Sequence, residues 1–495
     1  MSLDRWPQGV AAIAVALALG GCAMQPLQSG SGSPEGAPGA QSQNRRWPDP
    51  VQDANAYRAD SWGLVSMPVM ESYLNGLYTQ IKTLDGHPDW PGKVYVLTDP
   101  SLKLQSSAAG NVYISLGWIR SIESEDEIFA LLSHEYAHVA YGHHTLYDVA
   151  GFASTVSRIA ETALSMSQSS RPANSFDRSY WLAAGREITG RTLLPAWKRS
   201  VEEQADLYGA RLSLRAGYSY ARGFKTFLER IASYDQSFQS TAKGTRTATG
   251  PKPGGAAPQG QAGSASAPRW SDDHGDAIER EDALSTAISP ELAGRPRSEA
   301  RVEPWRKAAR HPETAEILDH YAKAEMVPDL LESNRPQEAY KLARIAASGR
   351  TANDAMPVFQ LAQASGAMRA SPAQQQLILL RHLDATERSW KMVLQVSRNA
   401  TRSNRTAAKN LLDAQFDLFG RPPMLYPEVI EFYRLNGFAN EAKSLSATCT
   451  IRYADYRDAC SASAKSDAEK QAEKAAAERE GKKLADQLTS KIKFK

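Results

Sequence analysis

Residues 124–144 constrain the fold of this chain more than any other stretch, because they predict a helix that carries a metal site. They contain an HExxH pattern that begins at His134 and ends at His138. On a helix these histidines stand one turn apart, with about 5–6 Å between Cβ atoms, so both imidazoles can bind one ion. Glu135 is rotated by about 100° from His134, so its carboxylate can face a metal-bound water. Two neutral imidazoles and an open position suit catalytic zinc, with Glu135 as the candidate general base.

The residues around the HExxH pattern also favour a helix. Ser124, with Glu127 three positions later, is typical of a capping box. Apolar residues then recur at helical spacing, at Ile128, Leu131, Leu132, Tyr136 and Val139. The alternative is a pair of surface histidines on a core helix. His143 and His144 are expected to be ordinary polar residues at the helix end.

A catalytic zinc site needs a third protein ligand, and residues 198–206 supply candidates. Glu202 and Asp206 are four positions apart and therefore share one face of a helix. Glu202 would complete a site of two histidines and one glutamate. Asp206 could accept a hydrogen bond from the distal N–H of a ligand histidine. Taken alone, the segment is more typical of an acidic, solvated helix face.

Length and composition indicate a protein of several parts. The 495 residues are enough for two or three domains. A content of 42% hydrophobic and 23% charged residues is typical of a soluble globular protein with polar tails. The formal net charge of +3 is small for this length, so we expect no nucleic-acid partner.

The N-terminus predicts export and lipidation. Arg5 and the apolar residues 10–19, a run too short to span a bilayer, are typical of a signal peptide. The run ends in a Leu-Gly-Gly-Cys sequence that resembles the bacterial lipobox, which implies removal of residues 1–21 and acylation of Cys22. Ala23 in the next position resembles the signal for the outer membrane. The alternative is an ordinary signal peptide or a tethering helix.

Export has two further consequences for the chain. Residues 22–50 include a stretch rich in Gly, Ser, Pro and Gln, and we expect a flexible tether there. Cys449 and Cys460 are the remaining cysteines, and an oxidising compartment favours a disulfide between them. Such a bond would stabilise the fold by roughly 3 kcal/mol. Two buried free thiols are the alternative.

A short sheet is predicted before the metal helix. Residues 67–84 are typical of a helix and residues 94–97 of a buried strand. The next strand alternates like an edge strand, and we expect it to pair with an extended substrate peptide by β-addition. It comprises Asn111, Val112, Tyr113, Ile114 and Ser115. A plain core strand is the alternative.

The two motifs together resemble those of the HtpX- and BepA-like zinc metallopeptidases, family forty-eight of the metallo class. The similarity rests on HExxH, on the ExxAD sequence that begins at Glu202, 64 residues after His138, and on the strand and acidic residues before the metal helix. It covers residues 60–290. In that family both histidines and the first glutamate of ExxAD bind zinc, which implies one zinc ion held by His134, His138 and Glu202. Integral-membrane members have hydrophobic spans that this chain lacks, so it resembles the soluble, periplasmic branch.

The resemblance also makes His274 a candidate catalytic residue. The related peptidases have a late His-Pro with an arginine six residues after the histidine. Here His274 and Arg280 keep that spacing, while Gly275 replaces the proline. A neutral imidazole near the metal could block water binding, and a protonated one could stabilise the oxyanion. The alternative is a polar loop histidine after a disordered insertion, which we predict at residues 237–270.

The predicted fold class is mainly α. Residues 51–310 would form an α+β metallopeptidase domain with a small edge-strand sheet over the HExxH helix, and residues 311–462 a helical, tetratricopeptide-like domain. Glu338 and Glu441 each begin a helix after a turn, and their separation of 103 residues is close to three such repeats. BepA-like proteins carry similar repeats; a nonrepetitive bundle is the alternative. Residues 463–495 are expected to be a charged helical tail.

These features predict a zinc endopeptidase of the bacterial periplasm, anchored to the outer membrane through Cys22. The resemblance implies unfolded or misassembled envelope proteins as substrates, and the outer-membrane assembly machinery as a partner of the helical domain. The competing hypothesis is a lipid-anchored adaptor or chaperone whose metal site is structural or silent. Glu135 argues against it, because a structural site has no use for a general base. A third hypothesis, a peptidase of cell-wall crosslinks, fits less well with an edge strand that favours long peptides.

Overall fold

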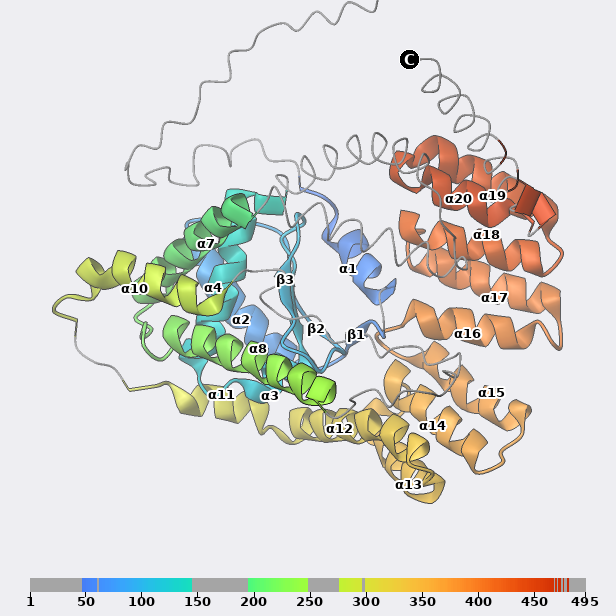
Figure 1. Cartoon of the computed structure of the whole chain (residues 1–495), viewed down its shortest axis with the longest axis horizontal. Helices are drawn as coiled ribbons and strands as arrows, with labels where there is room; N and C mark the ends of the chain where they lie inside the picture. Colours follow the sequence, from blue (N-terminus) through green and yellow to red (C-terminus); the bar gives the residue numbers. More distant parts are fainter. Residues whose placement is uncertain are drawn as a thin grey trace, which may run out of the picture.

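The computed structural model describes most of the folded part of the chain, over residues 47–59, 62–144, 195–247, 276–295 and 299–466, with isolated residues between 468 and 479. The predictions for the signal peptide, for Cys22 and for His274 lie outside the described residues. The fold is mainly α with a small four-stranded sheet, as predicted (Figure 1). None of the helices in the described ranges combines the length and the apolar character needed to cross a lipid bilayer.

The sheet has the strand order β1-β2-β4-β3, with β2 parallel to β4 and both outer pairs antiparallel. Its strands are β1 (Leu64–Val65), β2 (Val94–Leu97), β3 (Leu104–Ser106) and β4 (Val112–Ser115). The prediction that residues 111–115 form an edge strand is therefore wrong, because β4 is paired on both sides. The edge strands are β1 and β3. The one next to β4 is β3, whose three residues are too few to reveal an alternating pattern in the sequence.

Both faces of β4 are covered, which explains why all four of its residues are buried. Val112 and Ile114 belong to the main hydrophobic core. Tyr113 points the opposite way and stacks on Tyr57 of helix α1 (Pro50–Ala59), with ring centroids 3.5 Å apart. The alternation in the sequence thus reflects two buried layers, not one buried and one exposed face.

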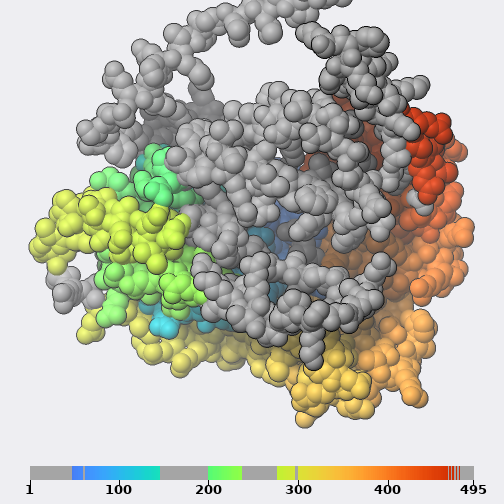
Figure 2. Space-filling model, in the orientation of Figure 1, coloured from blue at the N-terminus to red at the C-terminus, as the bar shows by residue number. Residues whose placement is uncertain are grey.

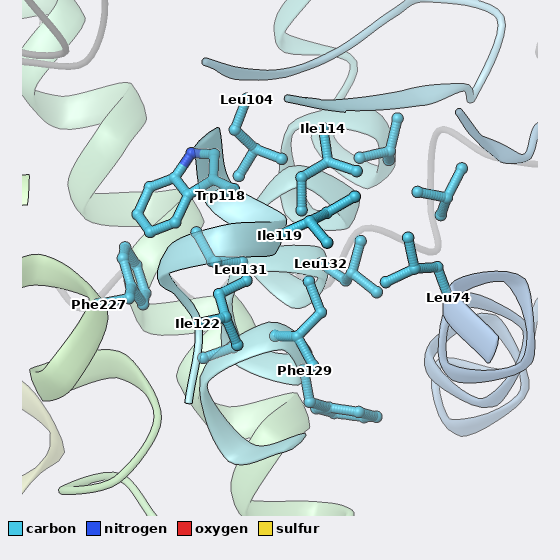
Figure 3. Close-up of a cluster of buried hydrophobic side chains, with 14 of the residues drawn as sticks. Leu74, Leu104, Ile114, Trp118, Ile119, Ile122, Phe129, Leu131, Leu132 and Phe227 are labelled. Atoms are coloured by element: carbon cyan, nitrogen blue, oxygen red, sulfur yellow. The ribbon is translucent and has the colours of Figure 1, made fainter. Parts of the chain in front are cut away.

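The HExxH helix, α4 (Glu125–Tyr141), lies at the centre of the main core, and every residue from 126 to 140 is buried. The Ser124 hydroxyl caps it by accepting a hydrogen bond from the Glu127 N–H at 3.3 Å. Gly142 ends it in a left-handed conformation with φ 68°. Figure 3 shows the apolar side chains packed around α4; the labelled residues are Leu74, Leu104, Ile114, Trp118, Ile119, Ile122, Phe129, Leu131, Leu132 and Phe227.

Helices from distant parts of the sequence enclose α4. Four of them pack on it directly: α2 (Pro68–Leu84), α7 (Pro195–Arg215), α8 (Phe224–Thr247) and α11 (Val302–Ala309). A fifth, α10 (Ala277–Leu292), packs on α7 and α8, and the short α3 (Leu116–Ser121) leads from β4 to α4.

Two predicted boundaries are wrong. Helix α8 continues to Thr247, so residues 237–247 are helical and not part of a disordered insertion; residues 248–270 lie outside the described part. The folded part also begins before the predicted end of the tether at residue 50. Trp47 packs on Trp90 with ring centroids 5.2 Å apart, and Pro50 already starts α1. Local composition did not show these contacts because they depend on partners far along the chain.

The C-terminal part is an arc of paired helices that curves around the sheet (Figure 1), and in Figure 2 its gold, orange and red atoms run along the lower edge and up the right side of the molecule. The second helices of successive pairs begin at Pro336, Pro372, Arg405 and Ala439, which are 36, 33 and 34 residues apart. These spacings are close to the 34 residues of a tetratricopeptide repeat. The helices are α12 (Pro312–Glu332), α13 (Pro336–Ala346), α14 (Ala355–Ala367), α15 (Pro372–Leu380), α16 (Trp390–Ala400), α17 (Arg405–Leu418), α18 (Tyr426–Leu435), α19 (Ala439–Arg452) and α20 (Arg457–Ala464). A disulfide between Cys449 and Cys460 joins α19 to α20.

The helical arc and the core around α4 are packed together. Tyr321 of α12 belongs to the same buried cluster as the residues of α4, so the core continues across the predicted boundary at residue 310. A second connection comes from the N-terminal segment. Arg58 of α1 forms a bidentate ion pair with Glu387, with Nε–Oε2 and Nη2–Oε1 distances of 2.6 and 3.2 Å. Helix α1 is therefore held between the sheet and the arc.

Asp354, at the start of α14, should make the stability of this arc depend on pH. Burial and the nearby Glu387 raise its pKa to about 7, although the Tyr321 hydroxyl donates to it at 3.1 Å. Between pH 4 and 7 the folded state then binds more protons than the unfolded state, so the unfolding free energy falls as the pH rises.

We therefore expect Asp354→Asn, which stays neutral, to be about 1–2 kcal/mol more stable than the wild type at pH 8 and equally stable near pH 4. The expected difference in unfolding free energy is smaller than for a fully buried carboxylate, because the side chain of Asp354 is only half-buried. Denaturant unfolding of both proteins at several pH values measures the difference. A difference that does not change with pH would contradict the prediction. Burial lowers the pKa of His382 to about 4, so its titration also changes the unfolding free energy with pH. This change is the same in both proteins and does not affect the difference between them.

Candidate metal centre

The structure brings the three predicted ligands together from two helices. His134 and His138 lie on α4 and Glu202 on α7, and all three side chains are buried. The two Nε2 atoms are 3.1 Å apart. Glu202 Oε2 lies 3.5 Å from His134 Nε2, and Glu202 Oε1 lies 3.6 Å from His138 Nε2. One ligand atom from each residue thus points to a common centre.

This donor set fits a zinc ion. Two nitrogen ligands and one carboxylate oxygen are typical of a catalytic zinc site, which keeps a further position open. Ligand atoms around a tetrahedral zinc stand about 3.4 Å apart, given bond lengths of about 2.0–2.2 Å. The two Nε2 atoms are 3.1 Å apart, each lies within 3.6 Å of one of the two Glu202 oxygens, and one atom from each residue can be chosen so that all three lie within 4.8 Å, which is compatible with this requirement.

Gly209 allows α7 to approach α4 closely enough for Glu202 to reach the histidines. A Cβ atom at this position would lie 2.9 Å from the backbone nitrogen of His134 and 2.9 Å from the backbone carbon of Ser133. Any larger residue would push the two helices apart. This close approach could be recognised in the sequence. Glycine inside a helix is less favourable than alanine by about 1 kcal/mol, so its presence there indicates tight packing.

Asp206 lies one turn after Glu202, where the predicted supporting carboxylate should be. Its Oδ1 is 3.0 Å from Nδ1 of His134, the ring nitrogen that faces away from the ligand cluster. Although burial alone would raise it, the pKa of Asp206 is held below its usual value by the guanidinium of Arg280 and by His134. Asp206 is therefore ionised at neutral pH and can orient His134 as an acceptor.

Arg280 of α10 completes the buried charge cluster. Its Nε and Nη2 atoms bind the two oxygens of Asp206 at 2.8 and 2.7 Å, and its Nη1 lies 3.3 Å from Glu202 Oε2. In the sequence, Arg280 stands out only for its spacing from His274, which does not indicate this role. One arginine thus joins the third ligand and the supporting carboxylate to a third helix.

Glu135 is buried beside the ligands and does not belong to them. Its Oε2 accepts a hydrogen bond from the Ser106 hydroxyl of β3 at 2.7 Å. Its Oε1 has no hydrogen-bond partner among the described residues. A buried carboxylate with one fixed oxygen and one oxygen to spare is suited to accept a proton from a bound water. No sequence signal pointed to Ser106.

The expectation for His143 is wrong, because it is not an ordinary polar residue at the helix end. Its ring is 2% exposed and contacts ligand His138 with Nδ1 and Gln204 of α7 with Nε2. His144 Nε2 lies 3.2 Å from the Ser106 hydroxyl, on the side of Glu135. Both histidines therefore belong to the surroundings of the metal centre.

The residues predicted to bind substrate serve the fold instead. Asn111 donates to the carbonyl of Pro50 and to Asp53 of α1, both at 2.8 Å. The Tyr113 hydroxyl also donates to Asp53, at 2.6 Å. Val112, Ile114 and Ser115 are buried between neighbouring strands and helices. The strand nearest to Glu135 is β3, which carries Ser106.

The comparisons with known proteins agree with this geometry. A search of protein families matches residues 105–288 to Peptidase family M48, and a search of curated proteins gives no match. The matched range contains both ligand helices, Ser106 and Arg280, so it covers the whole centre described above. The match over residues 105–288 therefore supports a metallopeptidase domain like those of family M48, as the two motifs predicted.

Proposed function

We propose that the chain is a zinc-dependent endopeptidase of the bacterial envelope that cleaves extended segments of unfolded or misassembled proteins. The observation that supports this most directly is Glu135, buried beside the ligand cluster with one carboxylate oxygen unpartnered among the described residues. An adaptor or chaperone with a structural metal site would not need such a group.

The residues of the centre have separate roles in the proposed reaction. His134, His138 and Glu202 would hold the ion. When bound, zinc polarises the scissile carbonyl and lowers the pKa of its water to about 7. Glu135 takes the proton from the attacking water on Oε1 and later gives it to the leaving amine. The Ser106 hydroxyl keeps Oε2 in place during both transfers.

The substrate would lie along β3 rather than along β4. Lys103 O and Ser107 N are hydrogen-bonded to β4, at 3.0 and 2.9 Å. In an antiparallel pair the intervening Ser106 then directs its backbone groups to the other side of β3. A peptide added there would gain main-chain hydrogen bonds and would pass next to Glu135, because the hydroxyl of Ser106 on this strand donates to Glu135. This arrangement favours long, unfolded chains over short crosslinks.

Anchoring and partner binding are further parts of the proposal. Acylated Cys22 would hold the enzyme at the outer membrane, and the helical arc would bind the machinery that assembles proteins there. The period of 33–36 residues in the arc supports a protein-binding role, since stacked repeats create extended binding surfaces. Cys22→Ala should release the protein from the membrane fraction into the soluble periplasm.

Cleavage of unfolded casein by the full-length protein tests the activity. We expect hydrolysis that a zinc chelator abolishes and that added zinc restores. A folded protein of similar size, offered as a second substrate, should be cut far more slowly. Hydrolysis that persists after complete removal of zinc, or zinc-loaded protein that cuts neither casein nor unfolded envelope proteins, would refute the proposed function.

Ser106→Ala should lower kcat by about 10–100-fold, because it removes a hydrogen bond of about 1.5–3 kcal/mol to the charged Glu135. Zinc affinity should stay at the wild-type value, since Ser106 does not contact the ligands. The matched control is Ser107→Ala, whose hydroxyl donates to Asp53 of α1 instead. Steady-state kinetics measure both variants. Equal kcat values for the two would show that Ser106 does not position Glu135.

A further inference from the structure

We propose that His143 and Gln204 form a hydrogen-bond relay that holds the ring of His138 in the orientation that binds zinc. The inference rests on the zinc site of the proposed function and deepens it. It concerns two positioning residues that neither the HExxH nor the ExxAD motif includes as a ligand or general base.

Two short contacts make up the relay. His143 Nδ1 lies 2.9 Å from His138 Nδ1, and His143 Nε2 lies 3.0 Å from Gln204 Oε1. The other nitrogen of His138, Nε2, points at the ligand cluster, 3.6 Å from Glu202 Oε1. Because His143 is 2% exposed, water cannot readily replace these bonds.

The direction of both hydrogen bonds follows from the chemistry of the ring nitrogens. A His138 that binds metal through Nε2 carries its proton on Nδ1 and donates it to His143. Nδ1 of His143 must then be the bare nitrogen, so the proton of that neutral ring sits on Nε2. Gln204 Oε1, which can only accept, faces this N–H. The amide of Gln204 therefore selects the tautomer of His143 that His138 requires.

The local sequence explains how His143 reaches this position. Gly142 ends α4 with φ 68°, and its N–H bonds back to the carbonyls of His138 and Val139. This left-handed residue, unfavourable for side chains other than glycine, turns the chain so that the next side chain returns to the last helical turn. Tyr141 then stacks on the His143 ring, with planes 10° apart and centroids 5.5 Å apart.

The relay differs from the support given to the other ligand histidine. His134 Nδ1 faces the ionised carboxylate of Asp206 at 3.0 Å, whereas His138 faces a neutral ring. The centre already contains the carboxylates of Glu135, Glu202 and Asp206. A neutral acceptor orients His138 without adding another negative charge to this buried cluster, where an uncompensated charge would be costly.

Zinc affinity of the full-length protein, measured by competition with a chromophoric chelator, tests the relay. His143→Phe keeps an aromatic ring against Tyr141 but removes both nitrogens, and we expect the affinity to fall about 10–100-fold. His143→Asn places its side-chain oxygen near the position of Nδ1, so it should recover most of the loss. Gln204→Leu removes the acceptor at the far end and should give a smaller fall than His143→Phe.

His87→Phe is the matched control, because His87 stacks on Trp90 away from the metal centre and its variant should bind zinc like the wild type. Wild-type affinity in His143→Phe, or equal losses in His143→Phe and His143→Asn, would overturn the relay. If His143→Phe does not fold, an unchanged affinity in Gln204→Leu overturns it. None of these measurements requires peptide cleavage. A wild type that binds zinc but cleaves nothing would refute the proposed function alone.

Discussion

Glu135→Gln should lower kcat for an unfolded protein substrate by about 10²–10⁴-fold, the contribution expected of a general acid–base group. The amide has the same size and can still accept from Ser106, which binds Oε2 at 2.7 Å in the wild type. It cannot take a proton from water. Zinc content should be unchanged, because Glu135 is not among the three grouped ligands. Steady-state kinetics and metal analysis of the same preparation measure both quantities.

Glu203→Gln is the matched control for this experiment. Glu203 is exposed on α7 and is not one of the three ligands. The same chemical change there should therefore leave kcat unaltered. If Glu135→Gln keeps full turnover while zinc is bound, the proton transfer must be assigned to another group. Loss of zinc together with loss of activity would instead give Glu135 a role in holding the ion.

Arg280→Met should have the largest effect on stability. The guanidinium binds both oxygens of Asp206 and lies 3.3 Å from Glu202, and all three side chains are buried. Removing one partner of a buried ion pair leaves an uncompensated charge and typically costs about 3–5 kcal/mol. Denaturant unfolding of the metal-free protein should show a loss of this size.

Two further variants separate charge from packing. Asp206→Asn combined with Arg280→Met removes the uncompensated carboxylate and should restore part of the stability, as a double-mutant cycle would show. Arg211→Met removes an exposed arginine of α7 that pairs with Glu291, and should cost less than about 1 kcal/mol. If Arg280→Met is no more destabilising than Arg211→Met, the buried cluster does not depend on its arginine.

The ligand set was predictable because it depends on short-range geometry. His134 and His138 stand one turn apart on any helix, and Glu202 and Asp206 share a face for the same reason. The Ser124 hydroxyl that caps α4 is also a local feature. The repeat period of the helical arc was visible for a related reason, since its successive helix pairs have similar lengths and turns.

Contacts between distant segments could not be predicted in the same way. Ser106 and Glu135 are 29 positions apart in the sequence, and Arg280 and Asp206 are 74 positions apart. Neither Ser106 nor Arg280 lies in a periodic pattern that indicates its role. The position of β4 was misassigned because its neighbour β3 has only three residues and because α1 covers its second face. His143 was misassigned even though Gly142 before it is a recognisable turn signal.

The ion pair between Arg58 and Glu387 joins residues 329 positions apart, and this bears on the order in which the protein can assemble. Helix α1 is synthesised early, yet one of its two partners appears only after most of the chain has been made. Until then α1, which covers Tyr113, lacks its ion pair with Glu387 of the arc. Contacts between such distant residues form late in folding because they must close a long loop. We therefore expect α1, and with it the cover over Tyr113, to become fixed only after most of the chain has been made.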